Sequence, residues 1–149
     1  MDGDDYARGD EGEDYLFGED GHDVLNGHDD DDLLFGGNGN DELWGMDGRD
    51  RLVGDNGLDS LRGGLGDDEL TGGDGADKFI FEWNGGHDII TDYEDKIDKI
   101  EFVSVVSDVS QLTISNSADG AVISYGIDNT ITLIGIHATD LGPADLILI

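Results

Sequence analysis

Several residue types that most globular domains rely on are scarce in this chain of 149 residues. There is no cysteine, a single proline, and only seven basic residues against 37 acidic ones. Without cysteine the sequence gives no direct sign of its redox compartment, and a disulfide-free acidic chain fits secretion that needs no oxidative folding. A net charge of −30 makes nucleic acid, anionic membrane surfaces and polyanionic polysaccharides poor partners. Small cations are the natural partners of such a chain.

Signals of catalysis and of membrane insertion are also missing. No HExxH motif, nucleophile elbow or paired-carboxylate frame stands out from the acidic background. The histidines have no metal-ligand spacing and are interpreted as surface residues: His22, His28, His87 and His137. No apolar run is long enough to span a bilayer, and no N-terminal signal peptide is recognised. We therefore expect a protein that is not an enzyme and does not insert into membranes.

A nine-residue repeat dominates what the sequence does contain. Five copies follow one another between residues 36 and 80, and the same register extends back to the N-terminus. Each regular copy has Gly at its first and fourth places, Asp at its sixth and a large apolar residue at its eighth. The sixth-place residues are Asp5, Asp14, Asp23, Asp32, Asp41, Asp50, Asp59, Asp68 and Asp77. A random acidic linker would not hold an apolar residue at one fixed place in nine, so the pattern predicts a folded repeat.

The places of the repeat predict a turn followed by a short strand. The eighth-place residue, such as Leu43 or Leu52, is the middle of a phrase of the form x-apolar-x, which predicts a three-residue strand that buries one side chain. A fourth-place Gly is typical of a backbone with positive φ. Asp30 replaces that Gly in one copy, and we expect its turn to be the weakest.

The nonapeptide resembles the calcium-binding repeat of RTX proteins, and residues 1–80 look like an RTX parallel β-roll. The resemblance implies an all-β, right-handed parallel β-solenoid with two nonapeptides per turn. Loops eighteen residues apart would then stack on one edge, with calcium between them. Two bare carboxylates about 5 Å apart repel by roughly 3 kcal/mol at an effective dielectric of 20. Without calcium, we expect the stack to open and the chain to be disordered.

The family resemblance also implies a ligand set for each ion. The second- and fourth-place carbonyls and the Asp of one loop act with the first- and third-place carbonyls and the Asp of the loop eighteen residues later. The regular copies then supply Gly37, Gly39 and Asp41 with Gly54, Asn56 and Asp59; Met46, Gly48 and Asp50 with Gly63, Leu65 and Asp68; and Asp55, Gly57 and Asp59 with Gly72, Asp74 and Asp77. Earlier gaps add Gly36 and Asn38, and Gly45 and Asp47, by the same rule. Nine loops leave up to about seven gaps for Ca2+.

The composition changes near residue 80, where Gly and Asp give way to β-branched and aromatic runs. Strands are predicted at 79–81, 88–91, 97–106, 112–114, 121–125 and 131–136, and residues 81–149 are interpreted as a β-rich cap over the open end of the roll. The start of this segment resembles the one after the repeats in serralysin-type proteases and other type I secreted proteins. By that resemblance Asp88, Asp92 and Asp98 are further ligand candidates, although solvated turn acids are an equal alternative.

The chain end offers two readings as well. Residues 145–149, an acid followed by apolar residues, resemble an uncleaved type I secretion signal, and a plain last strand is the alternative. The family resemblance implies an extracellular calcium-binding module that folds on binding calcium and supports export and folding of a covalently attached passenger domain by the type I secretion machinery.

A binding module of an RTX enzyme or adhesin, directed at a polysaccharide or a surface, is the alternative function. It predicts an aromatic or cationic surface. Eighteen-residue stacking would align apolar residues on one outer face, namely Tyr15, Phe17, Leu33, Phe35 and Val53. This face is either a docking surface or the result of β-propensity alone.

Overall fold

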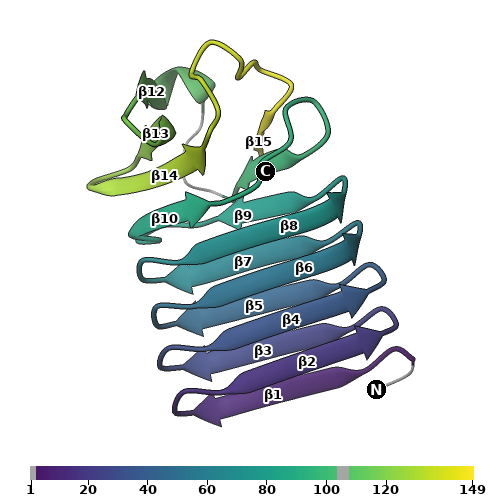
Figure 1. The fold of residues 1–149 in the computed structure, drawn as a ribbon. Coiled ribbons are helices and arrows are strands. Elements are labelled where there is room, and N and C mark those ends of the chain that lie inside the picture. Colours follow the sequence, from purple (N-terminus) through teal and green to yellow (C-terminus); the bar gives the residue numbers. More distant parts are fainter. Residues whose placement is uncertain (1–2, 104–107) are drawn as a thin grey trace.

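The computed structural model describes residues 3–103 and 108–149. The chain winds into a flattened coil of stacked strands, with a smaller group of strands over its C-terminal end (Figure 1). The coil begins with β1 (Tyr6–Glu11), β2 (Tyr15–Asp20), β3 (Val24–Asp29), β4 (Leu33–Asn38), β5 (Glu42–Asp47), β6 (Arg51–Gly57), β7 (Ser60–Leu65), β8 (Glu69–Gly75) and β9 (Lys78–Phe81). It is followed by β10 (His87–Ile90), β11 (Lys99–Phe102), the short 3-10 helix η1 (Val109–Gln111), β12 (Thr113–Asn116), β13 (Gly120–Tyr125), β14 (Asn129–Ile134) and β15 (Leu146–Leu148).

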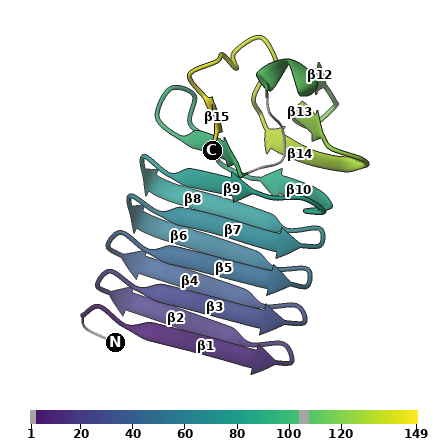
Figure 2. The ribbon, with the colours of Figure 1, turned by 180° about the vertical axis from the view of Figure 1, so that it is seen from behind.

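Successive strands alternate between two sheets. Strands β1, β3, β5, β7, β9 and β11, followed by β15, form a seven-stranded sheet. Strands β2, β4, β6, β8 and β10, followed by β14, β13 and β12, form an eight-stranded sheet (Figure 2). Within the repeats each strand pairs in parallel with the strand eighteen residues away, as Leu16 with Leu34 and Leu34 with Leu52. Two nonapeptides therefore make one turn, which we call a coil, and the parallel β-solenoid predicted from the sequence is confirmed.

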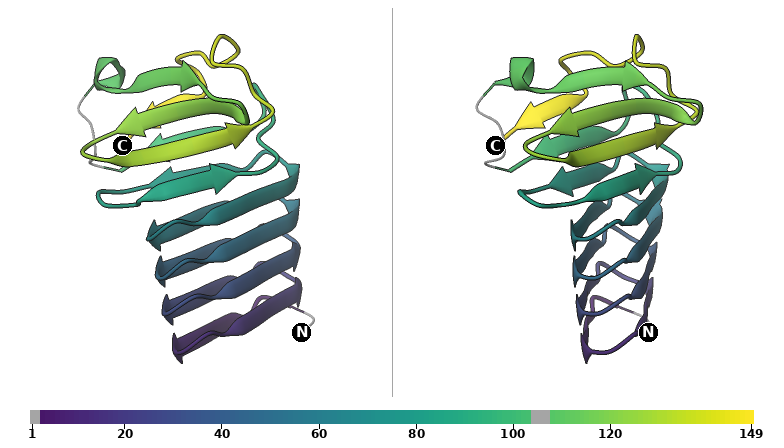
Figure 3. Two further views of the ribbon diagram at one scale, coloured as in Figure 1. Left: turned by 60° about the vertical axis from the view of Figure 1, so that its left-hand side comes forward. Right: turned by 90° about the vertical axis from the view of Figure 1, so that its left-hand side faces the viewer.

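The core is a single column of apolar side chains between the sheets. Figure 3 (right) shows the two layers of the coil edge-on. The eighth-place residues from Leu25 to Phe79 are all fully buried. Each buried leucine contributes roughly 2 kcal/mol, so this thin column supplies little stabilisation for the length of chain that it orders. Ile90 and Ile100 continue the column beyond the repeats, both at 0% exposure.

The strands are longer than the sequence pattern predicted. We expected three residues per strand, but β2 and β4 contain six each, because the ladder runs on through the first-place glycine to the third place. Pairs such as Glu19 with Gly37 show that the turn itself is stacked in register. Identical turns eighteen residues apart can pair with each other even where they do not alternate apolar and polar residues. The prediction was wrong because it followed side-chain alternation alone.

The turns need positive φ at two places, of which the sequence indicated one. The expected fourth-place conformation is confirmed, from Gly39 (φ 146°) to the substituted Asp30 (φ 80°). The second place also has positive φ, at Glu19 (77°), Met46 (89°) and Asp55 (73°) among others. Non-glycine residues rarely adopt this conformation without help. No residue type marks the second place, so the pattern contains no signal for it.

The cap continues both sheets before it leaves them. Strand β10 pairs with β8, and β11 pairs with β9 so that Ile100 lies beside Phe79. Strands β12, β13 and β14 then form an antiparallel group whose last strand pairs in parallel with β10. Of the strand predicted at 97–106, β11 covers Lys99–Phe102, and residues 104–107 lie outside the described residues. The part of the chain that the structure describes contains no helix long and apolar enough to cross a membrane.

Candidate functional site

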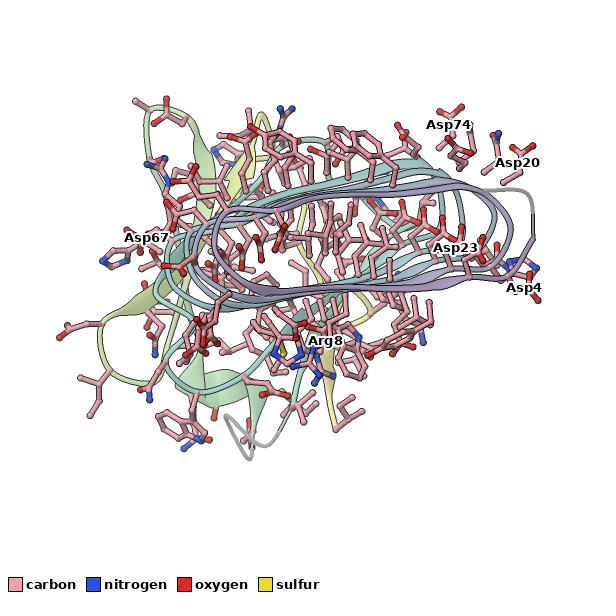
Figure 4. The ribbon with its side chains drawn as sticks, turned by 90° about the horizontal axis from the view of Figure 1, so that it is seen from below. Asp4, Arg8, Asp20, Asp23, Asp67 and Asp74 are labelled. Atoms are coloured by element: carbon pink, nitrogen blue, oxygen red, sulfur yellow. The ribbon has the colours of Figure 1, made fainter. Side chains whose placement is uncertain are left out.

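The sixth-place carboxylates form one column along each edge of the roll. Asp23, Asp41 and Asp59 belong to one column and Asp32 and Asp50 to the other, and all five are at most 4% exposed. Figure 4, a view along the roll from below, shows Asp23 inside the flattened coil, whereas Asp20 and Asp74 point outward from the same edge. The columns lie between the sheets, at the two ends of the leucine core. Their carboxylates are therefore shielded from solvent, unlike the many other acids of this chain.

From Asp23 onward, one oxygen of each column carboxylate is held by the preceding coil. The backbone N–H of Asp23 donates to Asp41 Oδ1, and that of Asp41 donates to Asp59 Oδ1, both at 2.8 Å. The same bond repeats along both edges and passes into the cap, where Asp68 N–H donates to Asp88 Oδ1 at 3.1 Å and Asp77 N–H to Asp98 Oδ1 at 2.9 Å. These bonds set the orientation of the carboxylates that accept them.

The other oxygen, Oδ2, is buried without a hydrogen-bond partner in most of the loops. It is unpaired in Asp5, Asp23, Asp32, Asp41, Asp50, Asp59, Asp68 and Asp77. A buried polar atom without a partner costs about 1–3 kcal/mol, and a charged one costs more. Natural structures contain few such atoms. A regular series of them, one per loop, indicates that another group, with positive charge, completes the site.

The first-place glycines keep the space beside these oxygens open. A β-carbon on Gly36 would lie 2.5 Å from Asp41 Oδ2 and 2.9 Å from the carbonyl oxygen of Gly54 in the next coil. On Gly9 the corresponding distances, to Asp14 Oδ2 and to the Gly27 carbonyl oxygen, are both 2.6 Å. Oxygens of two successive coils thus converge in a space that no side chain can enter. Calcium takes carboxylate and backbone carbonyl oxygens as its ligands, so the residues present fit this ion.

Backbone carbonyls face the same gaps from the turns. A β-carbon on Gly37 would overlap the second-place carbonyl oxygen of Glu19, and one on Gly39 would overlap the fourth-place carbonyl oxygen of Gly21. The second- and fourth-place carbonyls therefore point toward the later coil. Third-place carbonyls point the other way: that of Asn56 accepts from Gly39 N–H at 2.8 Å and that of Leu65 from Gly48 N–H at 2.9 Å. A carbonyl oxygen has a second lone pair, so this bond leaves each of them able to bind a cation.

Burial raises the pKa of the column carboxyls. Loss of hydration is the largest cause, backbone hydrogen bonds partly offset it, and neighbouring carboxylates add to it. The pKa rises to about 7 for Asp50 and Asp59 and to about 6 for Asp68 and Asp77. The columns thus bind positive charge strongly, whether as protons or as a metal ion.

The three candidates in the cap differ in their surroundings. Asp88 and Asp98 extend the two columns, and the third, Asp92, lies outside them. Both oxygens of Asp98 are hydrogen-bonded, because Oδ2 also accepts from Glu94 N–H at 2.8 Å. Asp92 accepts from Gly72 N–H at 2.9 Å and from Gly73 N–H at 2.8 Å. Of the three, Asp88 most closely resembles the carboxylates of the repeats.

Outer ladders of hydrogen bonds were not predicted from the sequence. Asn56 donates from Nδ2 to Asn38 Oδ1 at 2.9 Å, one coil away. At the fifth place, Leu58 N–H donates to Asn40 Oδ1 at 2.9 Å, and Asn40 N–H donates to His22 Nδ1 at 2.7 Å. The fifth place holds varied residues, some of them without an acceptor atom, so the sequence pattern gives no signal of this ladder. His22 therefore has a structural role in the turn.

Carboxylates alone do not make a metal centre at these gaps. Across residues 3–103 and 108–149, no group of three or more His, Cys, Asp and Glu side chains is placed to hold a metal ion. Each gap offers two carboxylates, for example those of Asp41 and Asp59. The remaining ligands of a cation must then be backbone carbonyls. Such a site suits a hard ion that takes six to eight oxygen ligands.

Comparisons with known proteins agree with this geometry. A family model described as the RTX calcium-binding nonapeptide repeat (4 copies) matches residues 1–34, 26–61 and 53–82. No curated protein matches the chain by sequence. Among solved structures, the AlgE6R2 subunit of the mannuronan C5-epimerase from Azotobacter vinelandii is 26% identical, with a TM-score of 0.57, and the match covers 92% of this chain and 90% of that one.

An extracellular lipase has the same fold over part of its length. LipA from Serratia marcescens is 19% identical with a TM-score of 0.51. The match covers all of this chain and 39% of the lipase, so the chain spans well under half of that protein.

Proposed function

The chain belongs to the RTX calcium-binding nonapeptide repeat family, and from this premise we propose that it is a module whose folding is controlled by calcium. The observation that carries the proposal is the regular series of buried, unpaired Asp Oδ2 atoms along both edges. Calcium ions between successive loops would pair these atoms and hold the coils together. The protein would thereby gain cohesion that its single column of leucines does not supply.

Each ion would take its ligands from two loops of one edge. For the gap between the Asp41 and Asp59 loops, we assign the carbonyls of Gly37 and Gly39 from the earlier loop and those of Gly54 and Asn56 from the later one, together with the two carboxylates. The convergence of Asp41 Oδ2 and the Gly54 carbonyl supports this set. The same rule gives up to about seven ions in the repeats.

The difference in calcium concentration across the cell envelope would control folding. In a calcium-poor cytoplasm, repulsion within the columns would keep the chain extended and fit for export. Outside the cell, calcium would neutralise the columns and fold the roll. Metal binding of this kind is coupled to folding because the site does not exist in the unfolded chain. We therefore assign the module to the extracellular space.

A module of this kind would serve a covalently attached passenger domain. The extracellular lipase LipA, of which the chain matches 39%, supports this arrangement. We propose that residues 1–80 are the calcium-binding roll and residues 81–149 its cap. We also propose that the chain itself has no catalytic role and that residues 145–149 are read by the type I secretion machinery.

A calcium titration followed by circular dichroism tests the proposal. We expect the β signal to be absent in calcium-depleted buffer at neutral pH and to appear cooperatively as calcium is added. Magnesium at the same concentration is the control, because its smaller octahedral shell suits these gaps poorly. A full β signal before calcium is added would refute control of folding by calcium.

A second candidate function is binding of a neutral polysaccharide. A groove of about 310 Å3 lies on the seven-stranded sheet beside the cap, lined by two indole rings together with charged and apolar residues: Trp44, Met46, Asp47, Arg62, Gly64, Leu65, Glu82 and Trp83. Arg62 lies over the Trp44 ring at 5.8 Å and pairs with Glu82 at 2.7 Å.

Affinity electrophoresis in gels containing a neutral glucan would test the second candidate. Retardation that is lost in Trp83→Ala and retained in Trp44→Phe would support it. Migration that is unchanged by the glucan would end it.

A further inference from the structure

Tyr125 of the cap brings a buried hydroxyl to the end of one carboxylate column. The residue ends strand β13 and is 2% exposed. Its ring packs between two others, with its centroid 5.3 Å from that of Phe102 and 6.2 Å from that of Phe81. Its hydroxyl has no hydrogen-bond partner. A buried tyrosine usually finds such a partner, so this oxygen is left available for another group.

The unpaired hydroxyl lies among oxygens of the last two loops on its edge. A β-carbon on Gly85 would overlap the Tyr125 hydroxyl and would lie 3.2 Å from Asp88 Oδ2 and 3.7 Å from the carbonyl oxygen of Gly64. Gly64 occupies the second place of its repeat. In the regular loops the carbonyl of the second place faces the gap to the next coil. Three oxygens, from one coil, from the loop after it and from the cap strand β13, therefore lie around the position of Gly85.

The gap between the Asp68 and Asp88 loops has the features of the regular gaps. Asp68 N–H donates to Asp88 Oδ1 at 3.1 Å, and Asp68 Oδ2 is unpaired. The fourth-place carbonyl of Gly66 faces Gly86 as that of Gly21 faces Gly39. The two loops are twenty residues apart, and the later one does not have the repeat phrase. The structure thus shows a gap that the nonapeptide register alone does not reveal.

The column ends at this gap for a steric reason. In the regular loops the first place is Gly, and a β-carbon there would meet the carboxylate of the same loop. Phe81 occupies the first place of the loop that contains Asp88 and is 4% exposed. Its ring packs on that of Phe102, with the two centroids 6.2 Å apart. A bulky side chain thus stands at the place that glycine keeps open in the regular loops.

Hydrogen bonds fasten the later loop to the cap strand β14. Thr130 N–H donates to the Gly86 carbonyl at 2.9 Å, and Gly86 N–H donates to Asn129 Oδ1 at 3.2 Å. His87 Nδ1 and Thr130 Oγ1 are 3.0 Å apart. Anything that orders this loop must therefore also order the β13–β14 hairpin.

We propose that a further calcium ion binds between the Asp68 and Asp88 loops and that the Tyr125 hydroxyl is one of its ligands, so that this ion locks the cap onto the roll. The proposal rests on the proposed calcium-binding function of the repeats. The donor set contains only oxygens, from two carboxylates, turn carbonyls and one hydroxyl, and such a set favours calcium over softer metals. The cap would then fold only on a roll that is already loaded with calcium.

Native mass spectrometry of the full chain in calcium, with Asp88→Asn and Tyr125→Phe variants, tests the proposal. Tyr125→Phe keeps the ring that packs on Phe81 and Phe102 and removes only the hydroxyl. We expect both variants to bind one ion fewer than the parent chain, or to bind it with an affinity at least tenfold lower in calorimetry. Tyr93→Phe is the matched control, because Tyr93 is also buried in the cap but its hydroxyl donates to the Asp98 carbonyl, at 3.3 Å.

Hydrogen exchange provides a second readout in the same samples. In saturating calcium the amides of β13 and β14 should lose protection in Asp88→Asn, while those of β3 to β6 keep it. An unchanged ion count and affinity in both variants would overturn the proposal. Loss of the ion in Asp88→Asn alone, or equally in Tyr93→Phe, would overturn the role of Tyr125. A parent chain that binds no calcium at all would instead refute the proposed function of the repeats.

Discussion

At the residue scale, the first-place glycine and the sixth-place aspartate act as one unit. The aspartate brings a carboxylate into the interior, and the glycine leaves open the space that its unpaired oxygen faces. A β-carbon on Gly36 would lie 2.5 Å from Asp41 Oδ2, well inside van der Waals contact. The first-place glycine is therefore needed because it has no β-carbon, whereas the fourth-place glycine is needed for its positive φ.

Substitution of Gly36 by Ala tests the steric role of the first place. We expect the loss of one calcium ion and a destabilisation of about 1–3 kcal/mol, the usual cost of forcing an extra carbon into a packed site. Ion counting and calcium titration of the fold measure the two effects. Gly142→Ala is the control, because a β-carbon there meets only Asp145 Oδ2, at 3.5 Å. Equal behaviour of the two variants would contradict the role assigned to the first place.

Replacement of Asp59 by Asn tests the shared carboxylate. Asp59 Oδ1 accepts from Asp41 N–H, and Asp59 N–H donates to Asp77 Oδ1, so this residue borders two gaps of one edge. Loss of its charge should weaken calcium binding at both gaps, which calorimetry would record as two sites with at least tenfold lower affinity. Asp74→Asn should bind like the parent chain, because the Asp74 side chain is exposed and only its carbonyl is assigned as a ligand. Two unchanged sites in Asp59→Asn would be inconsistent with the assignment.

At the scale of the elements, each strand and its turn stack on copies of themselves. Backbone hydrogen bonds and the outer ladders hold neighbouring coils together, and the buried carboxylates push them apart when they are charged. Phe17 and Phe35 stack with their centroids 5.1 Å apart, and Val53 continues their row, so the alignment predicted for this outer face is confirmed. Phe17 is 53% exposed. The use of this face as a docking surface stays a prediction.

The metal-free roll should become more stable as the pH falls. Burial raises the pKa of Asp50 and Asp59 from 3.8 to about 7, so the folded state binds protons more strongly than the unfolded state. Protonation of these groups therefore stabilises the fold fully below about pH 4, and this contribution is lost as the pH rises through 6 to 7. Circular dichroism in resin-treated, calcium-free buffer should show more β structure near pH 5 than near pH 8. A β signal that grows with pH in that buffer would contradict the cause given for the raised pKa values.

At the scale of the whole molecule, the charge is distributed so that folding depends on the solution. Residues 1–80 hold 25 acidic and 5 basic residues, and residues 81–149 hold 12 and 2. The half with the thinner core thus has the larger negative charge. The cap has the more varied apolar cluster, with Ile123, Ile131 and Leu133 fully buried. A roll that lacks cations has little to hold it together, whereas the cap needs the roll as a surface on which to pair.

Calcium should therefore change the size of the whole chain. A compact chain of this length has a radius of gyration of roughly 15 Å, and an unfolded one of roughly 40 Å. Small-angle X-ray scattering at neutral pH should record a fall of about twofold or more when calcium is added to the calcium-free protein. The elongated roll will lie somewhat above the compact value. Equal radii in the two conditions would rule out a folding transition controlled by calcium.

The repeat predicted a buried column of apolar residues, because a strict period gives every copy the same local structure. The resemblance of the repeat to the RTX family supplied the parallel solenoid and its eighteen-residue register. The repeat also indicated the positive φ of the fourth place, since a glycine that recurs in a turn has few other uses. No residue type in the sequence indicated the length of the strands, the positive φ of the second place or the fifth-place ladder. They depend on backbone contacts between coils, which many side chains tolerate.

Only the tertiary structure decided how the roll meets its cap. The alignment of Asp88 with Asp68 spans twenty residues, outside the nine-residue period, and the hydroxyl of Tyr125 arrives from a strand 37 residues further along the chain. Such distant groups come together through strand pairing between β8, β10 and β14. A sequence period predicts the contacts between repeats, because residues at the same place of successive coils lie side by side. Where the period stops, packing alone selects which groups meet.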